Sequence, residues 1–130
     1  MKNTGFALLL ILCLPFVSCT KSLIDPLKLQ GKWKITASYI SIGPPGKWTP
    51  IPTKKNYDYV QFNENGSLEG TLFTDYKTYL VKDSTTLTFF EIDKTIENYS
   101  YLLKDGTLTL SPAGPVYCIE GCAYRFVKVN

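Results

Sequence analysis

The chain has 130 residues, among them 14 lysines and arginines, 11 aspartates and glutamates and no histidine, and its formal net charge is +3. This near balance gives no electrostatic basis for binding nucleic acid, and we expect no nucleic-acid partner. Without histidine or a glycine-rich phosphate loop, the commonest catalytic and nucleotide-binding arrangements are excluded. We therefore expect that the protein is not an enzyme and that it holds no metal and no cofactor.

The first residues have the order of a secretory signal. Lys2 supplies a basic start and is followed by an apolar run that ends at Val17. The run is shorter than the about 20 apolar residues that a transmembrane helix needs, and Pro15 interrupts it. We predict that residues 1–18 are a signal peptide that is removed, which leaves 112 of the 130 residues, enough for one domain.

The segment from Leu14 to Cys19 resembles the lipobox of bacterial lipoproteins, in which small or apolar residues precede an acylated cysteine. The resemblance implies cleavage before Cys19, a lipid on this cysteine and a short tether over residues 19–30. It also implies that the membrane is a partner through this lipid. Because no aspartate directly follows Cys19, we expect the outer membrane, facing the periplasm. An ordinary signal peptide that is cut nearby is the alternative.

Two cysteines remain after this processing, because Cys13 leaves with the signal and Cys19 carries the lipid. In an oxidising compartment we expect Cys118 and Cys122 to form a disulfide. A redox pair or a metal site is the alternative. Redox motifs usually space their cysteines by two residues, however, and two sulfurs without a histidine make a poor zinc site.

Residues 31–130 contain short apolar and β-branched runs of period two, separated by turn residues, and this pattern predicts an all-β domain. The expected strands are 33–42, 57–62, 67–73, 76–82, 86–92, 97–103, 107–110 and 117–129. About eight strands with short connections favour a single antiparallel up-and-down β-barrel, which leaves no free sheet edge. The adjacent aromatics Phe89 and Phe90 interrupt the alternation and predict a bulge or a strand that is buried on both sides.

The prolines of segment 43–52 exclude an interior strand and predict a stiff loop that covers one end of the barrel. The glutamates are scattered over predicted turns and polar faces, where solvated surface is the expected environment; they include Glu64, Glu69, Glu91, Glu97 and Glu120.

Gly31-Lys32-Trp33, at the start of the first expected strand, resembles the Gly-x-Trp signature of lipocalins, and Arg125 on the last strand adds to the resemblance. In lipocalins a late arginine packs across the early tryptophan at the closed end of the barrel. The resemblance therefore implies a cation–π pair of Trp33 and Arg125 in a lipocalin-like barrel. The alternative is that Trp33 is a core residue and Arg125 a surface residue.

Five aromatic residues are candidates for contact with a ligand. Trp48 lies in segment 43–52, which corresponds to the loop that often covers the ligand in lipocalins. The other four lie on or near apolar faces, where a cavity needs an apolar wall with a few polar groups: Tyr39, Tyr76, Tyr99 and Tyr101. Packing in the core or at the barrel rim is the alternative for each of them.

We predict from these observations a membrane-anchored lipoprotein whose barrel binds a small apolar or amphipathic ligand in its interior. The alternative function is a periplasmic protein-binding module, an inhibitor or accessory subunit, with a filled barrel core and an unidentified protein partner.

Overall fold

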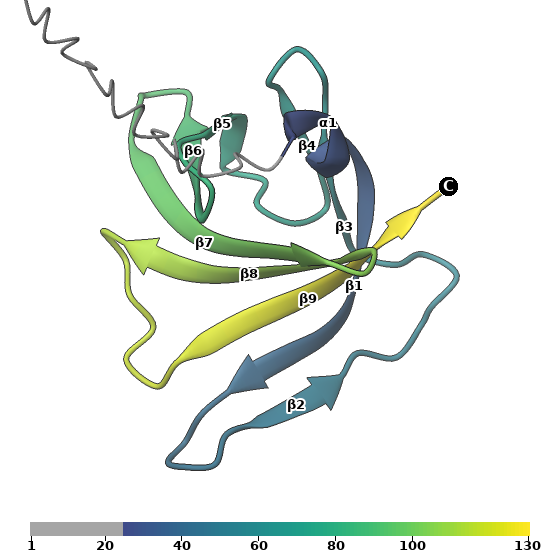
Figure 1. Ribbon diagram of the computed structural model, residues 1–130, viewed down its shortest axis with the longest axis vertical. Helices are drawn as coiled ribbons and strands as arrows, with labels where there is room; N and C mark the ends of the chain where they lie inside the picture. The colour runs from purple at the N-terminus through teal and green to yellow at the C-terminus, as the bar shows by residue number, and fades with distance from the viewer. Residues whose placement is uncertain (1–24) are drawn as a thin grey trace, which may run out of the picture.

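The computed structural model describes residues 25–130, and the predicted signal peptide and Cys19 lie outside this range. The described residues form one short helix and nine strands (Figure 1). In chain order the elements are α1 (Pro26–Leu29), β1 (Gly31–Ile40), β2 (Lys47–Pro50), β3 (Tyr59–Phe62), β4 (Leu68–Gly70), β5 (Tyr76–Val81), β6 (Thr86–Glu91), β7 (Ile96–Lys104), β8 (Thr107–Gly114) and β9 (Cys122–Val129).

All strands belong to one antiparallel sheet with the order β4-β3-β1-β9-β8-β7-β6-β5, and β2 pairs with β1 outside this path. The sheet curves until its two edge strands meet, where Ser67 and Thr78 form an isolated bridge. Next to the bridge, the Tyr79 N–H donates to the Gly66 carbonyl at 2.9 Å. The result is a nearly closed eight-stranded barrel, which confirms the predicted all-β, up-and-down, lipocalin-like architecture.

The long strand β1 has two partners on the same edge. Its first residues, Gly31 to Lys34, pair with β3, and its last residues, Ala37 to Ile40, pair with β2. The β1–β2 hairpin extends the sheet below the barrel (Figure 1). The prediction that segment 43–52 is wholly irregular is therefore wrong at β2. Pro50 is tolerated there because β2 is an edge strand, which need not donate hydrogen bonds on both sides.

The bulge predicted near Phe89 and Phe90 lies in the neighbouring strand. Tyr76 of β5 pairs with Glu91 and Thr78 pairs with Phe90, which leaves Lys77 as the extra residue. In β6 three consecutive residues, Leu87, Thr88 and Phe89, are buried, so this strand is also buried on both faces of the sheet.

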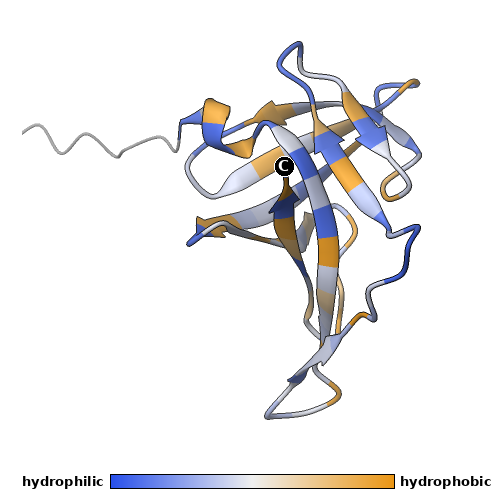
Figure 2. Cartoon of the chain, turned by 90° about the vertical axis from the view of Figure 1, so that its right-hand side faces the viewer, coloured by the Kyte–Doolittle hydropathy of each residue, from blue (hydrophilic) through white to orange (hydrophobic). Residues whose placement is uncertain are grey.

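The barrel interior is packed with large side chains. The largest that are less than 2% exposed are Trp33, Phe62, Phe89, Phe126, Leu29, Leu87, Leu108, Leu110 and Val60. Orange apolar and blue polar residues alternate along several strands in Figure 2, as expected where one sheet face is buried. At one end, α1 closes the barrel: the Trp33 Nε1–H donates to the Leu29 carbonyl at 2.7 Å. We call this the closed end.

The predicted pair of Trp33 and Arg125 does not form. Trp33 of β1 lies opposite Lys128 of β9, and the Lys128 Nζ lies 5.5 Å from the centre of the Trp33 ring. A bulge between Ile35 and Ala37 shifts the register of β1 against β9. On β9, Phe126 is buried in the core, and Arg125 is the next residue along the strand, so its side chain points to the other face. Arg125 therefore faces outward, where its guanidinium lies 3.9 Å from the centre of the Trp48 ring.

The predicted disulfide is confirmed, since Cys118 and Cys122 are bonded in the connection between β8 and β9. This connection lies beside the β1–β2 loop, because the Ser41 N–H donates to the carbonyls of Glu120 and Gly121, each at 3.1 Å. The bond therefore braces two loops at the end of the molecule away from α1.

Gly70 ends β4 with a φ of +141°, and a Cβ at this position would overlap the carbonyl oxygen of Tyr59. We expect Gly70→Ala to lower the free energy of unfolding by about 2 kcal/mol, since it adds steric overlap to backbone strain. Gly106→Ala is the matched control, because φ there is +72° and nothing lies within 4 Å of the added Cβ. Its cost should stay near 1 kcal/mol. Urea unfolding of both variants checks this difference, and equal losses would contradict the steric argument.

Candidate ligand-binding site

A pocket of about 220 Å³ opens at the barrel end opposite α1, and we call it the mouth pocket. Its lining comes from β1, β7, β8, β9 and the β4–β5 turn, and consists of Ile35, Leu72, Phe73, Tyr99, Pro112, Tyr124 and Phe126. Four of the five elements are long strands that lie side by side in the sheet in the order β1-β9-β8-β7, so the packed core holds most of the wall in place. The lining is largely apolar and aromatic, with the tyrosine hydroxyls as its polar groups.

Phe73 separates this pocket from the packed core. Its ring centre lies 5.3 Å from those of Phe89 and Tyr99 and 6.5 Å from that of Phe126. Its φ is +58°, in the left-handed region that a bulky residue rarely adopts. The predicted strand over 67–73 is therefore wrong beyond Gly70: the chain turns there and places Phe73 in the open end of the barrel.

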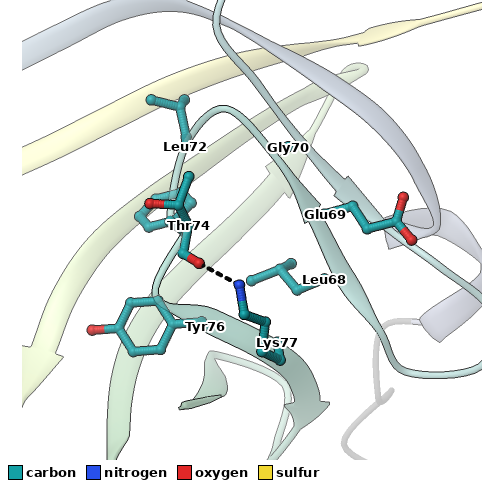
Figure 3. A pocket seen from close by; sticks show the side chains of 8 residues that line it. Leu68, Glu69, Gly70, Leu72, Thr74, Tyr76 and Lys77 are labelled. Atoms are coloured by element: carbon teal, nitrogen blue, oxygen red, sulfur yellow. Dashed lines mark hydrogen bonds between the residues drawn. The ribbon is translucent and has the colours of Figure 1, made fainter. Parts of the chain in front are cut away.

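A second pocket, of about 280 Å³, lies at the gap between β4 and β5, and Figure 3 shows it from close by. It shares Leu72 and Phe73 with the mouth pocket, and Glu69 and Lys77 give it a charged rim. The Lys77 ammonium donates to the Thr74 carbonyl at 2.7 Å, the contact dashed in Figure 3. The gap exists because regular pairing of β4 and β5 is confined to one bridge.

Glu97 contradicts the expectation of a solvated surface residue, since it is only 4% exposed. It begins an inward series on β7 that continues with Tyr99 and Tyr101, both buried. Its Oε2 accepts the Val116 N–H at 3.1 Å, whereas its Oε1 has no hydrogen-bond partner among the described residues. Glu97 alternates in step with Tyr99 and Tyr101 along the strand, and this pattern in the sequence could have predicted that Glu97 is buried.

The tyrosines beside Glu97 are held in their neutral form. Burial raises the pKa of Tyr76, and the charge of Glu97 raises it further. Burial also raises the pKa of Tyr99, with added contributions from Tyr76 and Glu97. Both hydroxyls therefore stay protonated and can donate hydrogen bonds throughout the neutral range.

The raised pKa of Tyr99 predicts a loss of stability at alkaline pH. The unfolded chain releases this proton near the ordinary pKa of 10.0, whereas the folded protein retains it. The stabilisation is therefore complete below about pH 10 and is lost as the pH rises towards the folded pKa. We expect Tyr99→Phe to reduce the fall in unfolding free energy measured between about pH 9 and about pH 11. Tyr117→Phe, at a 69% exposed position, should leave that fall unchanged.

The structure brings two of the five candidate aromatic residues to the open end. Tyr99 lines the mouth pocket and Tyr76 lines the neighbouring one. Tyr101 is buried further along β7, where its hydroxyl donates to the Asp83 carbonyl at 3.2 Å. Tyr39 and Trp48 pair with each other on the outer face, with ring centres 5.4 Å apart.

Three lining residues that sequence reasoning missed come from places where the pattern carries no period. Leu72 and Phe73 lie in a turn, and Pro112 lies where β8 has a register shift against β7. Tyr124 faces inward because Phe126, two residues later, is buried in the core, and this alternation was visible in the sequence.

Within residues 25–130 no group of three or more histidine, cysteine, aspartate or glutamate residues is arranged to hold a metal ion. No helix in the same range is long and apolar enough to cross a membrane. Comparison with known proteins finds no protein-family model and no curated protein that matches this chain.

Proposed function

We propose that this protein is a lipid-anchored envelope protein that binds one small amphipathic molecule at the mouth pocket. The observation that carries the binding proposal is the pocket's composition: an open concavity of about 220 Å³ with an apolar and aromatic wall. Sites for small molecules are typically concave and apolar with a few polar groups, and commonly exceed about 300 Å³. A pocket of this size therefore suits a short alkyl chain or a single ring.

The packed core supports a ligand at the mouth of the barrel in preference to one deep inside it. Phe62, Phe89 and Phe126 fill the interior and are each at most 1% exposed. Phe73 packs against Phe89 and Phe126, and it lines the mouth pocket together with Phe126. A ligand would reach further only if Phe73 moved.

The position of the N-terminal end supports this arrangement in an anchored protein. The described chain begins next to α1, at the closed end (Figure 1). The strand registers place the lining residues of the mouth pocket towards the opposite end. Residues 20–30 can span at most about 35–40 Å between a lipid on Cys19 and the start of β1. The closed end would then lie nearer the outer membrane and the mouth would face the periplasm.

Fractionation of a bacterial host that expresses the full chain tests the anchor. We expect the protein in the membrane fraction with acyl chains on Cys19 detected by mass spectrometry. The variant Cys19→Ala should lose both, whereas Cys118→Ala should keep the acyl chains. Recovery of the unmodified protein in the soluble fraction would contradict the proposal.

Calorimetric titration with octanol tests the pocket. We expect one binding site that is lost in Ile35→Trp, because the larger side chain would fill the pocket from β1. Leu102→Trp is the matched control, since Leu102 is 58% exposed on β7 and does not line the pocket. Circular dichroism checks that both variants are folded. Unchanged binding by a folded Ile35→Trp protein would place the ligand elsewhere.

A protein-binding module is the second candidate function, and it is favoured by an apolar tip on the two loops that the disulfide braces. The tip side chains are large and exposed: Ile42 at 84%, Val116 at 68%, Tyr117 at 69% and Ile119 at 100%. Such a cluster is typical of a contact surface for the apolar face of another protein. Crosslinking in envelope extract tests this function. We expect the wild type to capture one stoichiometric partner, Ile119→Ser to lose it, and Leu102→Ser to keep it.

A further inference from the structure

We propose that the mouth pocket selects amphiphiles that carry a protonated amine, which the carboxylate of Glu97 recognises. This inference rests on the proposed function, since it names the class of ligand for the same pocket. It begins from Glu97, whose Oε1 is buried without a hydrogen-bond partner among the described residues. Buried polar atoms are almost always paired in folded proteins, and a carboxylate oxygen left unpaired calls for a donor.

Glu97 does not itself line the mouth pocket, but its neighbour on the same face of the strand does. Glu97 and Tyr99 are two residues apart on the inward face of β7, and Tyr99 lines the pocket. The Val116 N–H holds the other carboxylate oxygen at 3.1 Å, so the group has a fixed orientation. Burial and then the charge of Glu97 raise the pKa of Tyr76, which lines the neighbouring pocket, so the carboxylate also lies close to that side chain.

Two basic side chains on nearby strands are engaged elsewhere, and no basic side chain of the described residues bonds the Oε1 of Glu97. Lys77 of β5 donates to the Thr74 carbonyl at 2.7 Å. Arg125 of β9 lies on the outer face, 3.9 Å from the centre of the Trp48 ring. The positive charge that would complement Glu97 is therefore expected from a ligand.

An alkylammonium ion has the chemistry that this arrangement requires. One of its three N–H donors can pair with Oε1, and a charge-assisted bond of this kind is stronger than a neutral one. Its alkyl chain would contact Ile35, Leu72 and Phe73 in the pocket. The aromatic faces of Tyr99 and Tyr124 would add attraction for the cation, whereas an anionic amphiphile would be repelled by Glu97.

Titration of the purified protein with octylamine, octanol and octanoate tests the selection, because the three probes share a chain length and differ in head group. We expect octylamine to bind about tenfold more tightly than octanol, and octanoate to bind most weakly. Glu97→Gln should lower the octylamine affinity about tenfold and leave the octanol affinity within about threefold. Its amide oxygen can still accept the Val116 N–H, so we expect the variant to fold. Glu69→Gln is the matched control, since Glu69 is an exposed carboxylate at the neighbouring pocket and should leave all three affinities unchanged.

The outcomes separate this inference from the proposed function. Equal wild-type affinities for the three probes, or an octylamine affinity that a folded Glu97→Gln protein retains, would overturn the amine selection and leave octanol binding at the pocket intact. Absence of binding by all three probes would overturn both. If Glu97→Gln fails to fold, the wild-type order of the three probes decides the question.

Discussion

Replacement of Trp33 by alanine is expected to lower the free energy of unfolding by about 3–5 kcal/mol. The side chain is 1% exposed and is one of the largest in the core. Its Nε1–H also donates a hydrogen bond to the Leu29 carbonyl at the end of α1. The variant would therefore lose packed volume and the attachment of the helix that closes the barrel. Urea unfolding followed by circular dichroism measures the loss.

Trp48→Ala is the matched control, because the chain has only these two tryptophans. Trp48 is half-buried on the outer face, where it contacts Tyr39 and Arg125. Loss of these contacts is expected to cost about 1 kcal/mol. Similar losses for the two variants would show that Trp33 does not have the central packing role that its burial indicates.

Replacement of Phe73 by alanine is expected to lower the free energy of unfolding by about 3 kcal/mol and, at the same time, to enlarge the mouth pocket. The ring contacts Phe89, Tyr99 and Phe126 and is part of the pocket wall. Its removal makes space for about two further methylene groups of a ligand, which corresponds to about tenfold tighter binding of octanol. Unfolding and titration of the same protein measure both effects. A loss of stability without tighter binding would show that the core collapses into the space.

Phe73→Gly separates the backbone from the side chain at this position. Alanine and glycine both remove the ring, but glycine adopts the observed φ of +58° without strain. We expect the glycine variant to be more stable than the alanine variant by about 1 kcal/mol, which is the reverse of their order in regular structure. If alanine is the more stable, the turn does not retain this backbone conformation in the variants.

The amino-acid sequence predicted the architecture because the alternation of apolar and polar residues is local. It identified most strands, their order along the chain and the buried face of β7, where Tyr99 and Tyr101 alternate with exposed residues. The bond between Cys118 and Cys122 was likewise predicted without knowledge of the fold, because these are the two cysteines left after signal removal and lipidation. These features depend only on neighbours within a few residues.

The tertiary structure alone decided which side chains meet across the barrel. Arg125 faces outward because it alternates with the buried Phe126, and a bulge near Thr36 turns the second half of β1 to the same outer face; no local pattern specifies where a long strand bulges. The turn at Phe73 and the unpaired oxygen of Glu97 likewise depend on strands that are distant in the sequence. Alternation determines which residues share a face, whereas pairing between distant strands determines what each of them contacts, because a shift of one residue moves a whole segment to the other face.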